Sequence, residues 1–220
     1  MRGCIILANG RPPGRKHLEF FRAHGYPFLI CADGGAETAR EMGLVPDLIA
    51  GDLDSVTGAT LAIFSGVCTI EKIAGQYDTD VEKCLKIAIE RGFTGCVIMG
   101  ATGDRLDHSF NNIGIAVKYD PAIKIMVVSE ATCMQVISGD LTINGVAGET
   151  VSLFGIDRET LFTTSGLQYP LNGESLPFGV RDGTSNVATT GPFSVRVEGG
   201  TGILMRELEK VIVGGGFDTN

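Results

Sequence analysis

Up to about residue 130, short apolar runs alternate with longer stretches in which apolar residues recur at helical spacing. The runs with the character of buried strands are Cys4–Ala8, Phe28–Ala32, Leu48–Ala50, Cys96–Met99 and Ile123–Val128. Strands that are apolar on both faces belong to sheets that crossover helices cover on both sides. The alternation therefore predicts an α/β fold, with a Rossmann-like, mostly parallel sheet in an N-terminal domain over residues 1–130.

The clearest predicted helix follows Thr79, because apolar residues recur there at three- and four-residue steps until Gly92 interrupts them. Asp78 or Thr79 is its expected N-cap, since short polar side chains accept hydrogen bonds from the first helical turn. Shorter helices are expected at about Lys16–His24, Ala36–Met42 and Asp107–Lys118.

Beyond residue 130, the runs become shorter, alternate in polarity and are broken by glycine. Asn144-Gly145 and Asn172-Gly173 have the composition of hairpin turns, and Gly199-Gly200 follows the alternating run Phe193–Val197. This pattern predicts a small C-terminal β-sandwich over residues 131–213. The glycine-rich residues 214–220 are expected to form a flexible tail.

The chain has 220 residues and a formal charge of −8, from 26 acidic and 18 basic residues, and no stretch gathers Lys and Arg into a stripe. A nucleic-acid-binding surface is therefore not expected. No apolar run is long enough to cross a bilayer and the first run is too short for a signal peptide, so we expect no membrane association and a cytoplasmic location. The six cysteines show no CxxC spacing and are expected to be buried free thiols.

Acidic residues lie directly after two of the predicted strands and at the start of the long helix. They are Asp33, Asp52, Asp54, Asp78 and Asp80. Because ligands bind where the carboxyl ends of parallel strands meet, we expect these carboxylates to converge at one edge. Like charges repel, so such a cluster needs a cation, and hard oxygen ligands favour Mg²⁺. Each Asp taken alone could equally be a turn or capping residue.

Two glycine-rich turns follow predicted strands. Asp33-Gly34-Gly35-Ala36 would let the backbone approach a phosphate or a ribose at the start of a helix. Gly100-Ala101-Thr102-Gly103-Asp104-Arg105 also supplies a guanidinium that could clamp a phosphate. The simpler interpretation makes Arg105 and Asp107 a surface ion pair and His108 a helix-start residue, and for His108 it is preferred.

Five motifs stand in a fixed order along the chain. They are Cys31-Ala32-Asp33-Gly34-Gly35-Ala36, Pro46-Asp47-Leu48-Ile49-Ala50-Gly51-Asp52-Leu53-Asp54-Ser55, Thr79-Asp80, Gly100-Ala101-Thr102-Gly103-Asp104-Arg105-Leu106-Asp107-His108 and Gly183-Thr184-Ser185-Asn186. With this order, and with the change from α/β to β character between the fourth and the fifth motif, the sequence resembles the thiamin pyrophosphokinases from Asn9 to about Val197.

The resemblance implies a homodimeric thiamine diphosphokinase that transfers the pyrophosphoryl group of Mg-ATP to the hydroxyl of thiamin, giving thiamin diphosphate and AMP. The N-terminal domain would bind the nucleotide, and the sandwich of the other subunit would contribute to the thiamin site. The catalytic, Mg²⁺-binding residues would be Asp52, Asp54 and Asp80. Nucleotide contacts would come from Asn9, Asp33, Gly34, Gly35, Arg105 and Asp107. Thiamin contacts would come from Asp80, Ser185 and Asn186.

Two positions depart from the family pattern. Many members have Lys-Asp-x-Thr-Asp where this chain has Gln76-Tyr77-Asp78-Thr79-Asp80, so either Asp78 substitutes from the next position or one polar contact is lost. Asp104 stands where a glycine is usual and adds a charge beside the expected phosphates. Because the chain has no Trp, any stacking on thiamin must come from Phe or Tyr.

Two other functions are compatible with parts of the sequence. Asp52-Leu53-Asp54-Ser55-Val56 matches the DxDx[TV] motif of haloacid-dehalogenase-like phosphatases, in which the first Asp is the nucleophile. That motif normally ends the first strand, whereas two strands are predicted before it here. The third possibility is a non-catalytic thiamin- or nucleotide-binding module, which the loss of an Asp at Tyr77 would favour.

Overall fold

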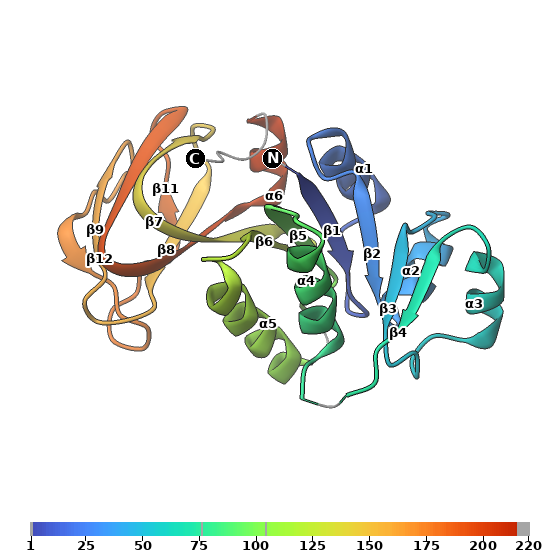
Figure 1. Cartoon of the computed structure of the whole chain (residues 1–220). Coiled ribbons are helices and arrows are strands. Elements are labelled where there is room, and N and C mark those ends of the chain that lie inside the picture. Colours follow the sequence, from blue (N-terminus) through green and yellow to red (C-terminus); the bar gives the residue numbers. More distant parts are fainter. Residues whose placement is uncertain (1, 76, 104, 215–220) are drawn as a thin grey trace. The chain divides into compact units, whose positions relative to one another are not determined.

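A computed structural model describes residues 2–75, 77–103 and 105–214 of the chain (Figure 1). The chain divides into two compact units, Met1–Glu130 and Ala131–Asn220. Gln76, Asp104 and nearly all of the expected tail, residues 215–220, lie outside the described residues. Gly214, the first residue of that tail, is the C-cap of the last helix, α6 (Leu208–Val213).

The first unit contains a parallel sheet, as the apolar runs predict. Its strands are β1 (Gly3–Leu7), β2 (Phe28–Ala32), β3 (Leu48–Gly51), β4 (Thr69–Lys72), β5 (Gly95–Met99) and β6 (Lys124–Val128). They lie in the order β6-β5-β1-β2-β3-β4, and every neighbouring pair is parallel. The α/β fold is therefore confirmed. The sequence did not predict β4, because this edge strand is exposed or half-buried throughout and lacks an apolar run.

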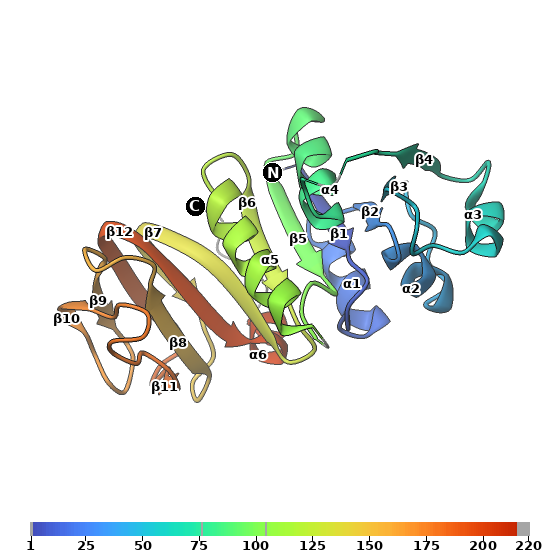
Figure 2. The same ribbon diagram turned by 90° about the horizontal axis from the view of Figure 1, so that it is seen from below.

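Helices cover both faces of this sheet. They are α1 (Arg15–Ala23), α2 (Gly35–Glu41), α3 (Gly58–Phe64), α4 (Asp80–Glu90) and α5 (Leu106–Tyr119). Figure 2 shows α1 and α2 on one face and α4 on the other. The Thr79 hydroxyl caps α4 by accepting a hydrogen bond from the Glu82 amide at 3.3 Å, so Thr79 rather than Asp78 is the N-cap.

The direction of strand addition reverses next to β1. From β1 the chain adds β2, β3 and β4 on one side, and after α4 it returns to add β5 and β6 on the other side. In open α/β sheets, the crevice at such a reversal is where ligands bind. The loops after β1 and β5 meet there, because the Gly10 amide donates a hydrogen bond to the Gly100 carbonyl at 2.7 Å.

The second unit is built from antiparallel strands. They are β7 (Thr132–Asn144), β8 (Thr150–Gly155), β9 (Leu161–Ser165), β10 (Asn172–Ser175), β11 (Asn186–Val187) and β12 (Pro192–Glu207). The first half of β12 pairs with β9 and the second half with β8, while β7 pairs with both halves. Apolar side chains from all four of these strands form one core, in which Phe162 and Phe193 are the largest.

Two expected turns and one expected strand end of this unit differ from the structure. Asn144-Gly145 does not close a hairpin between its neighbours, since β8 pairs with β12 and β11. Gly199-Gly200 does not end a strand, because β12 continues to Glu207 through an irregularity between Val197 and Gly202. Asn172-Gly173 lies within β10, at a register shift. In the last two cases the glycine marks an interruption of pairing rather than a reversal of the chain.

Two further expectations can be compared with the structure. The six cysteines are free thiols, and all except the half-buried Cys68 are buried, as expected. In the described part of the chain, we find no helix with the length and apolar character needed to span a membrane.

Gly35 is a site of close backbone packing at the start of α2. A Cβ atom on this residue would lie 2.0 Å from the carbonyl oxygen of Leu7 in the buried strand β1. We therefore expect Gly35→Ala to destabilise the protein by about 1–3 kcal/mol, because the backbone must move to relieve the overlap. Urea denaturation followed by circular dichroism measures the change.

Gly58→Ala is the matched control, since Gly58 also begins a helix and a Cβ there would meet nothing within 4 Å. It should leave stability unchanged or raise it by up to about 1 kcal/mol, because alanine lowers the entropy of the unfolded chain. Equal stability of the Gly35→Ala and Gly58→Ala variants would contradict the close packing at Gly35.

Candidate active site

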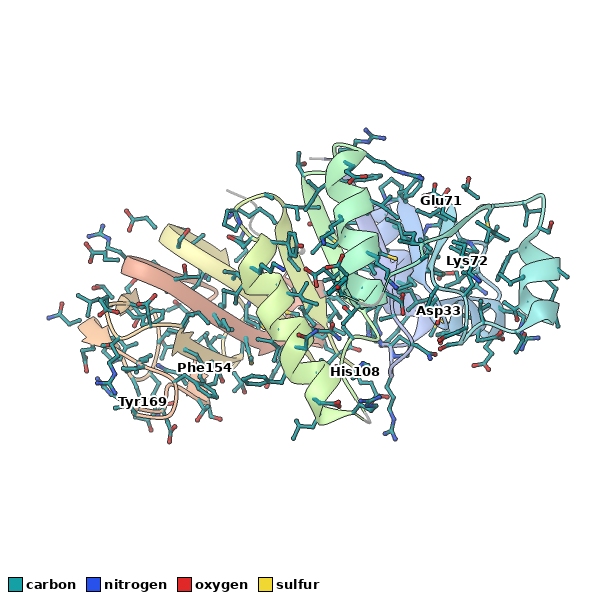
Figure 3. All side chains as sticks on the ribbon, turned by 60° about the horizontal axis from the view of Figure 1, so that its bottom comes forward. Asp33, Glu71, Lys72, His108, Phe154 and Tyr169 are labelled. Atoms are coloured by element: carbon teal, nitrogen blue, oxygen red, sulfur yellow. The ribbon has the colours of Figure 1, made fainter. Side chains whose placement is uncertain are left out.

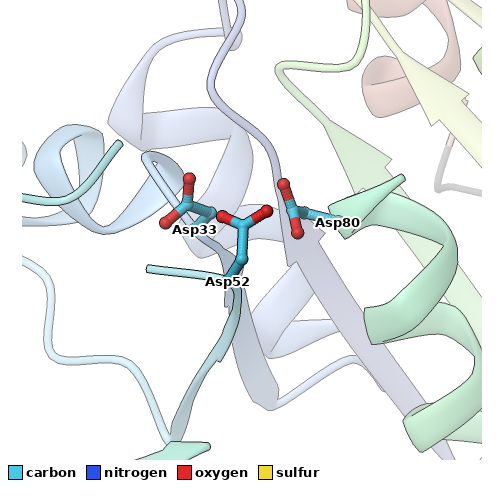
Figure 4. Close-up of side chains that lie close together, drawn as sticks. All are labelled: Asp33, Asp52 and Asp80. Atoms are coloured by element: carbon cyan, nitrogen blue, oxygen red, sulfur yellow. The ribbon is translucent and has the colours of Figure 1, made fainter. Parts of the chain in front are cut away.

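Three carboxylates converge at the carboxyl edge of the parallel sheet. Asp33 follows β2, Asp52 follows β3, and Asp80 is the first residue of α4. One oxygen from each lies within 4.8 Å of the others, and Figure 4 shows the three side chains directed toward a common space. Sheet topology thus brings together residues that are far apart in the sequence.

The backbone around this cluster is shaped so that the carboxylates can approach one another. Gly51, at the end of β3, has φ +153°, and a Cβ there would lie 2.9 Å from the Asp33 Cβ and 3.1 Å from Asp80 Oδ1. Asp33 and Leu53 both adopt positive φ angles, 43° and 61°, which are uncommon for residues other than glycine. Such backbone strain is concentrated at functional sites.

Asp33 is the most buried member of the cluster, with 3% of its surface exposed. The Ser55 amide donates a hydrogen bond to Asp33 Oδ2 at 3.1 Å, while the buried Oδ1 has no hydrogen-bond partner among the described residues. Burial raises the pKa of Asp33; hydrogen bonds from Ser55 lower it, and the charges of Asp80 and Asp52 raise it again, leaving it above its ordinary value. A bound cation would give Asp33 Oδ1 a partner and would supply a positive charge beside this carboxylate.

Lys83, one turn after Asp80 on α4, provides a positive charge beside the cluster. Its Nζ lies 2.8 Å from Asp80 Oδ1 and 3.6 Å from Asp52 Oδ2. Burial lowers the pKa of Lys83, but the hydrogen bond to Asp80 and the charges of Asp80 and Asp52 leave it above its ordinary value. Sequence reasoning did not identify Lys83, although its spacing of three residues from Asp80 on a helix was the available signal.

The structure separates two other acidic residues from this cluster. Asp54 is exposed and accepts a hydrogen bond from its neighbour Ser55 at 2.9 Å. Asp78 forms an ion pair with Lys86 on α4, at 2.7 Å. Within the described ranges, neither belongs to the group whose oxygens lie within 4.8 Å. Asp78 is therefore not one of these three carboxylates, and Tyr77, which stands where many members of the family have an Asp, is fully exposed.

A cavity of about 490 Å³ lies beside the carboxylates, at the reversal of strand order. The expected site residues that line it are Asn9, Asp33, Gly34, Asp80 and Arg105. His108 lines the cavity as well. It lies in the first turn of α5, as expected, and its side chain also borders the cavity (Figure 3). Gly35 instead serves the packing of α2 on β1.

Arg105 and Asp107 form an ion pair at the start of α5. Arg105 Nε and Nη2 donate hydrogen bonds to the two carboxylate oxygens of Asp107, at 3.2 Å and 2.5 Å. The hydrogen bond from Arg105 is the main reason that the pKa of Asp107 falls to about 2. This is the surface pair of the simpler interpretation, but Arg105 also lines the cavity. Asp107 therefore holds the guanidinium at the rim of the cavity.

Asn112 is a residue of this site that sequence reasoning missed. It is 6% exposed, lines the cavity, and its Nδ2 donates a hydrogen bond to the Ala101 carbonyl at 2.7 Å. The side chain thereby fixes the glycine-rich turn after β5 to α5. An asparagine on the same helix face as the buried Ile115 and Ala116 was the signal in the sequence.

In the second unit, Ser185 and Asn186 differ in how freely they could contact a ligand. Ser185 is exposed and has φ +59°, and its amide donates to the Ser152 hydroxyl at 3.1 Å. The Asn186 side chain donates to the Tyr169 carbonyl at 2.7 Å and accepts from the Tyr169 amide at 3.0 Å. Asn186 therefore holds the backbone of Tyr169, an aromatic residue that is 64% exposed (Figure 3).

The strand order does not support the phosphatase alternative. Asp52 follows β3, and the sheet contains β1 and β2 before it in sequence. The motif with a nucleophilic Asp normally ends the first strand.

Comparison with known proteins adds independent findings. A family model described as "Thiamin pyrophosphokinase, catalytic domain" matches residues 23–127. A second, described as "Thiamin pyrophosphokinase, vitamin B1 binding domain", matches residues 140–204. The chain is 28% identical to thiamine pyrophosphokinase 3 of Oryza sativa subsp. japonica over 213 residues, which is 84% of this chain and 78% of that protein. It is also 28% identical to thiamine pyrophosphokinase 1 of Arabidopsis thaliana, over 72% of this chain and 70% of that protein.

Solved structures show the same fold. The thiamine pyrophosphokinase from Bacillus subtilis superposes with a TM-score of 0.81 at 23% identity, covering 93% of this chain and 98% of that chain. The enzyme from Geobacillus thermodenitrificans superposes with a TM-score of 0.77 at 26% identity, covering 93% and 97%. The two family matches together cover most of the chain. The catalytic-domain match lies within the α/β unit, and the vitamin B1 binding-domain match lies within the antiparallel unit. The chain belongs to the thiamin pyrophosphokinase family.

Proposed function

We propose that the protein transfers the pyrophosphoryl group of Mg-ATP to the hydroxyl of thiamin, giving thiamin diphosphate and AMP. The observation that carries this proposal is the group formed by Asp33, Asp52 and Asp80 beside a cavity at the reversal of strand order. Family membership supports the choice of substrates.

The residues present fit a hard divalent cation. The ligand atoms in the cluster are all carboxylate oxygens, which Mg²⁺ prefers, and Asp33 Oδ1 is buried without a hydrogen-bond partner in the described structure. We assign Asp52 and Asp80 to the cation, with Asp33 adding an oxygen from the buried side. We assign Asp54, which is exposed two residues after Asp52, to a cation that arrives with the nucleotide.

The transfer forms a bond between the thiamin hydroxyl oxygen and the β-phosphorus and breaks the bond from that phosphorus to the oxygen that leaves with AMP. Bound Mg²⁺ would neutralise charge on the phosphate oxygens. Asn9 and Gly34 line the cavity where the nucleotide would bind, and Arg105 can donate to a phosphate from its rim. A carboxylate of the cluster, such as Asp80, accepts the proton of the attacking hydroxyl.

The second unit is assigned to thiamin. Ser185 offers an exposed hydroxyl, and Asn186 acts by holding Tyr169, whose ring could stack on a heteroaromatic ligand. The proposal includes a homodimer in which these residues serve the partner's active site. It also includes a cytoplasmic location, which the six free cysteines favour because thiols stay reduced there.

Incubation with Mg-ATP and thiamin, with AMP and ADP resolved by chromatography, tests the reaction. We expect AMP and thiamin diphosphate in equal amounts. ADP would indicate transfer of a single phosphate, and binding of both ligands without AMP would indicate a non-catalytic module. Either result would overturn the proposal.

Mixing Asp52→Asn chains with Ser185→Ala chains tests the shared site. If the partner supplies Ser185, each mixed dimer regains one intact site, and activity should return toward about half of that dimer's capacity. Mass spectrometry of the mixture verifies that subunits exchange. Exchange without recovery of activity would show that each site lies within one chain.

Replacing Arg105 with lysine should lower the catalytic efficiency of the transfer. A lysine keeps the charge but loses the planar pair of donors, so we expect kcat/KM for ATP to fall by about tenfold or more. Steady-state kinetics at saturating thiamin measure the effect. Arg196→Lys is the control, because Arg196 forms a comparable exposed ion pair with Asp140 in the other unit. If both substitutions leave kcat/KM unchanged, Arg105 is a surface ion-pair residue only.

A further inference from the structure

Lys83 is a buried ammonium group inside an acidic site. Its side chain is 5% exposed, and its Nζ contacts carboxylates from two different elements: Asp80 on α4 at 2.8 Å and Asp52 after β3 at 3.6 Å. Burying a lysine costs free energy unless the charge is paired. The residue therefore does more than fill space, because an apolar side chain would occupy the same position without that cost.

The charges of the cluster can be counted. Three carboxylates contribute −3 and Lys83 contributes +1, which leaves a formal charge of −2. A single divalent cation neutralises that charge. A site with the three carboxylates alone would retain one negative charge after binding one such cation.

We propose that Lys83 is a positioning residue of the metal site, which holds Asp52 and Asp80 together in the metal-free protein and limits the cluster to one weakly held divalent cation before nucleotide binds. This inference rests on the proposed function for its role in catalysis, but its physical basis is the geometry of Asp33, Asp52, Asp80 and Lys83. The buried Asp33 Oδ1 without a partner independently marks the cluster as a ligand site.

Replacing Lys83 should lower the stability of the metal-free protein but raise its affinity for the cation. Without Lys83, the carboxylates repel one another with no internal counter-charge, so the metal-free protein should become less stable. The cation, however, no longer competes with a neighbouring ammonium, so it should bind more tightly. A lysine that served packing alone would lower stability and leave metal affinity unchanged or weakened.

The experiment compares Lys83→Met with the wild-type protein in the absence of ATP and thiamin. Mn²⁺ is the probe, and electron paramagnetic resonance of the free ion gives the affinity and the number of ions bound. We expect one Mn²⁺ per wild-type chain. Lys83→Met should bind Mn²⁺ about tenfold more tightly or better, since an adjacent unit charge changes carboxylate equilibria by roughly one to three pKa units. Its metal-free melting temperature should fall.

Lys86→Met is the matched control, because it removes the same charge from the next turn of α4 and breaks the ion pair with Asp78 instead. It should leave Mn²⁺ affinity within about twofold of wild type, since exposed pairs are strongly screened. If Lys83→Met binds Mn²⁺ no more tightly than Lys86→Met, or if two ions bind per wild-type chain, the inference is wrong.

A double variant keeps the test decisive if Lys83→Met folds poorly. Asp80→Asn combined with Lys83→Met restores the formal charge of −2 on the cluster. Its metal-free melting temperature should return toward that of wild type, and a value as low as that of Lys83→Met would refute the charge-based role. Because these measurements contain no substrates, they remain informative whatever the transfer assay shows.

Discussion

Asp52→Asn should reduce turnover of Mg-ATP and thiamin by on the order of 10²-fold or more, because it removes a carboxylate from the cation site that we propose at the reacting phosphates. The fold should be preserved, since asparagine has the same shape and Asp52 is half-buried at the end of β3. Metal-free stability should stay level or rise, because one of three repelling charges is lost while Lys83 keeps its hydrogen bond to Asp80. Turnover at limiting Mg²⁺ and a thermal melt measure the two effects.

Asp54→Asn, two residues away, provides the comparison. Its carboxylate is exposed and outside the group of three, so Mn²⁺ binding to the nucleotide-free protein should remain within about twofold of wild type, as expected for a screened charge. Its turnover should nevertheless fall, because we assign Asp54 to the cation that accompanies the nucleotide.

Near-wild-type turnover of Asp52→Asn at limiting Mg²⁺ would show that the cation site is wrongly assigned.

The largest effect on stability is expected in the second unit, at the ion pair of Glu149 with Arg206. Both side chains are almost completely buried, and Arg206 Nε and Nη2 donate to the two Glu149 oxygens at 2.6 Å and 3.0 Å. Arg206 Nη2 also donates to the Asn144 carbonyl, and the Val146 amide donates to Glu149 Oε2. Arg206→Met leaves a buried carboxylate without its counter-charge and should destabilise the protein by about 3–5 kcal/mol.

Urea denaturation measures this loss of stability. Two further variants show whether it comes from the unpaired buried charge. Glu149→Met combined with Arg206→Met should recover most of the stability, because replacing a buried pair by apolar residues is often neutral. Arg196→Met, on the same strand β12, breaks an exposed ion pair and should barely move the denaturation midpoint. A similar midpoint for Arg196→Met and Arg206→Met would mean that burial of the pair does not determine its contribution.

The parallel sheet could be predicted because its central strands are buried on both faces and therefore uniformly apolar. The edge strand β4 and the short helix α3 carry no such pattern, since Thr69–Lys72 is exposed or half-buried and α3 buries little besides Thr60 and Phe64. Gly199-Gly200 suggested the end of a strand because sequence alone cannot distinguish a break in register from a turn.

The convergence of acidic residues could be anticipated because topology sends the ends of parallel strands to one edge. Sequence could not show which carboxylates meet, because that depends on backbone angles such as the positive φ of Asp33 and Leu53. Lys83 and Asn112 were missed because their spacing on a helix is only a weak signal until the partners from other elements, Asp52 and the Ala101 carbonyl, are known.

We expect the strand β12 to make the antiparallel unit unfold as a single cooperative unit. Its first half pairs with β9 and its second half with β8, and side chains of both halves enter the same core. Opening either half exposes apolar surface that the other half also covers, so amides in β8 and β9 should exchange with solvent deuterium through one common unfolding event. A fragment that ends between Val197 and Gly202 would therefore lack a native state of its own, and attempts to divide the unit for expression or permutation should avoid that segment.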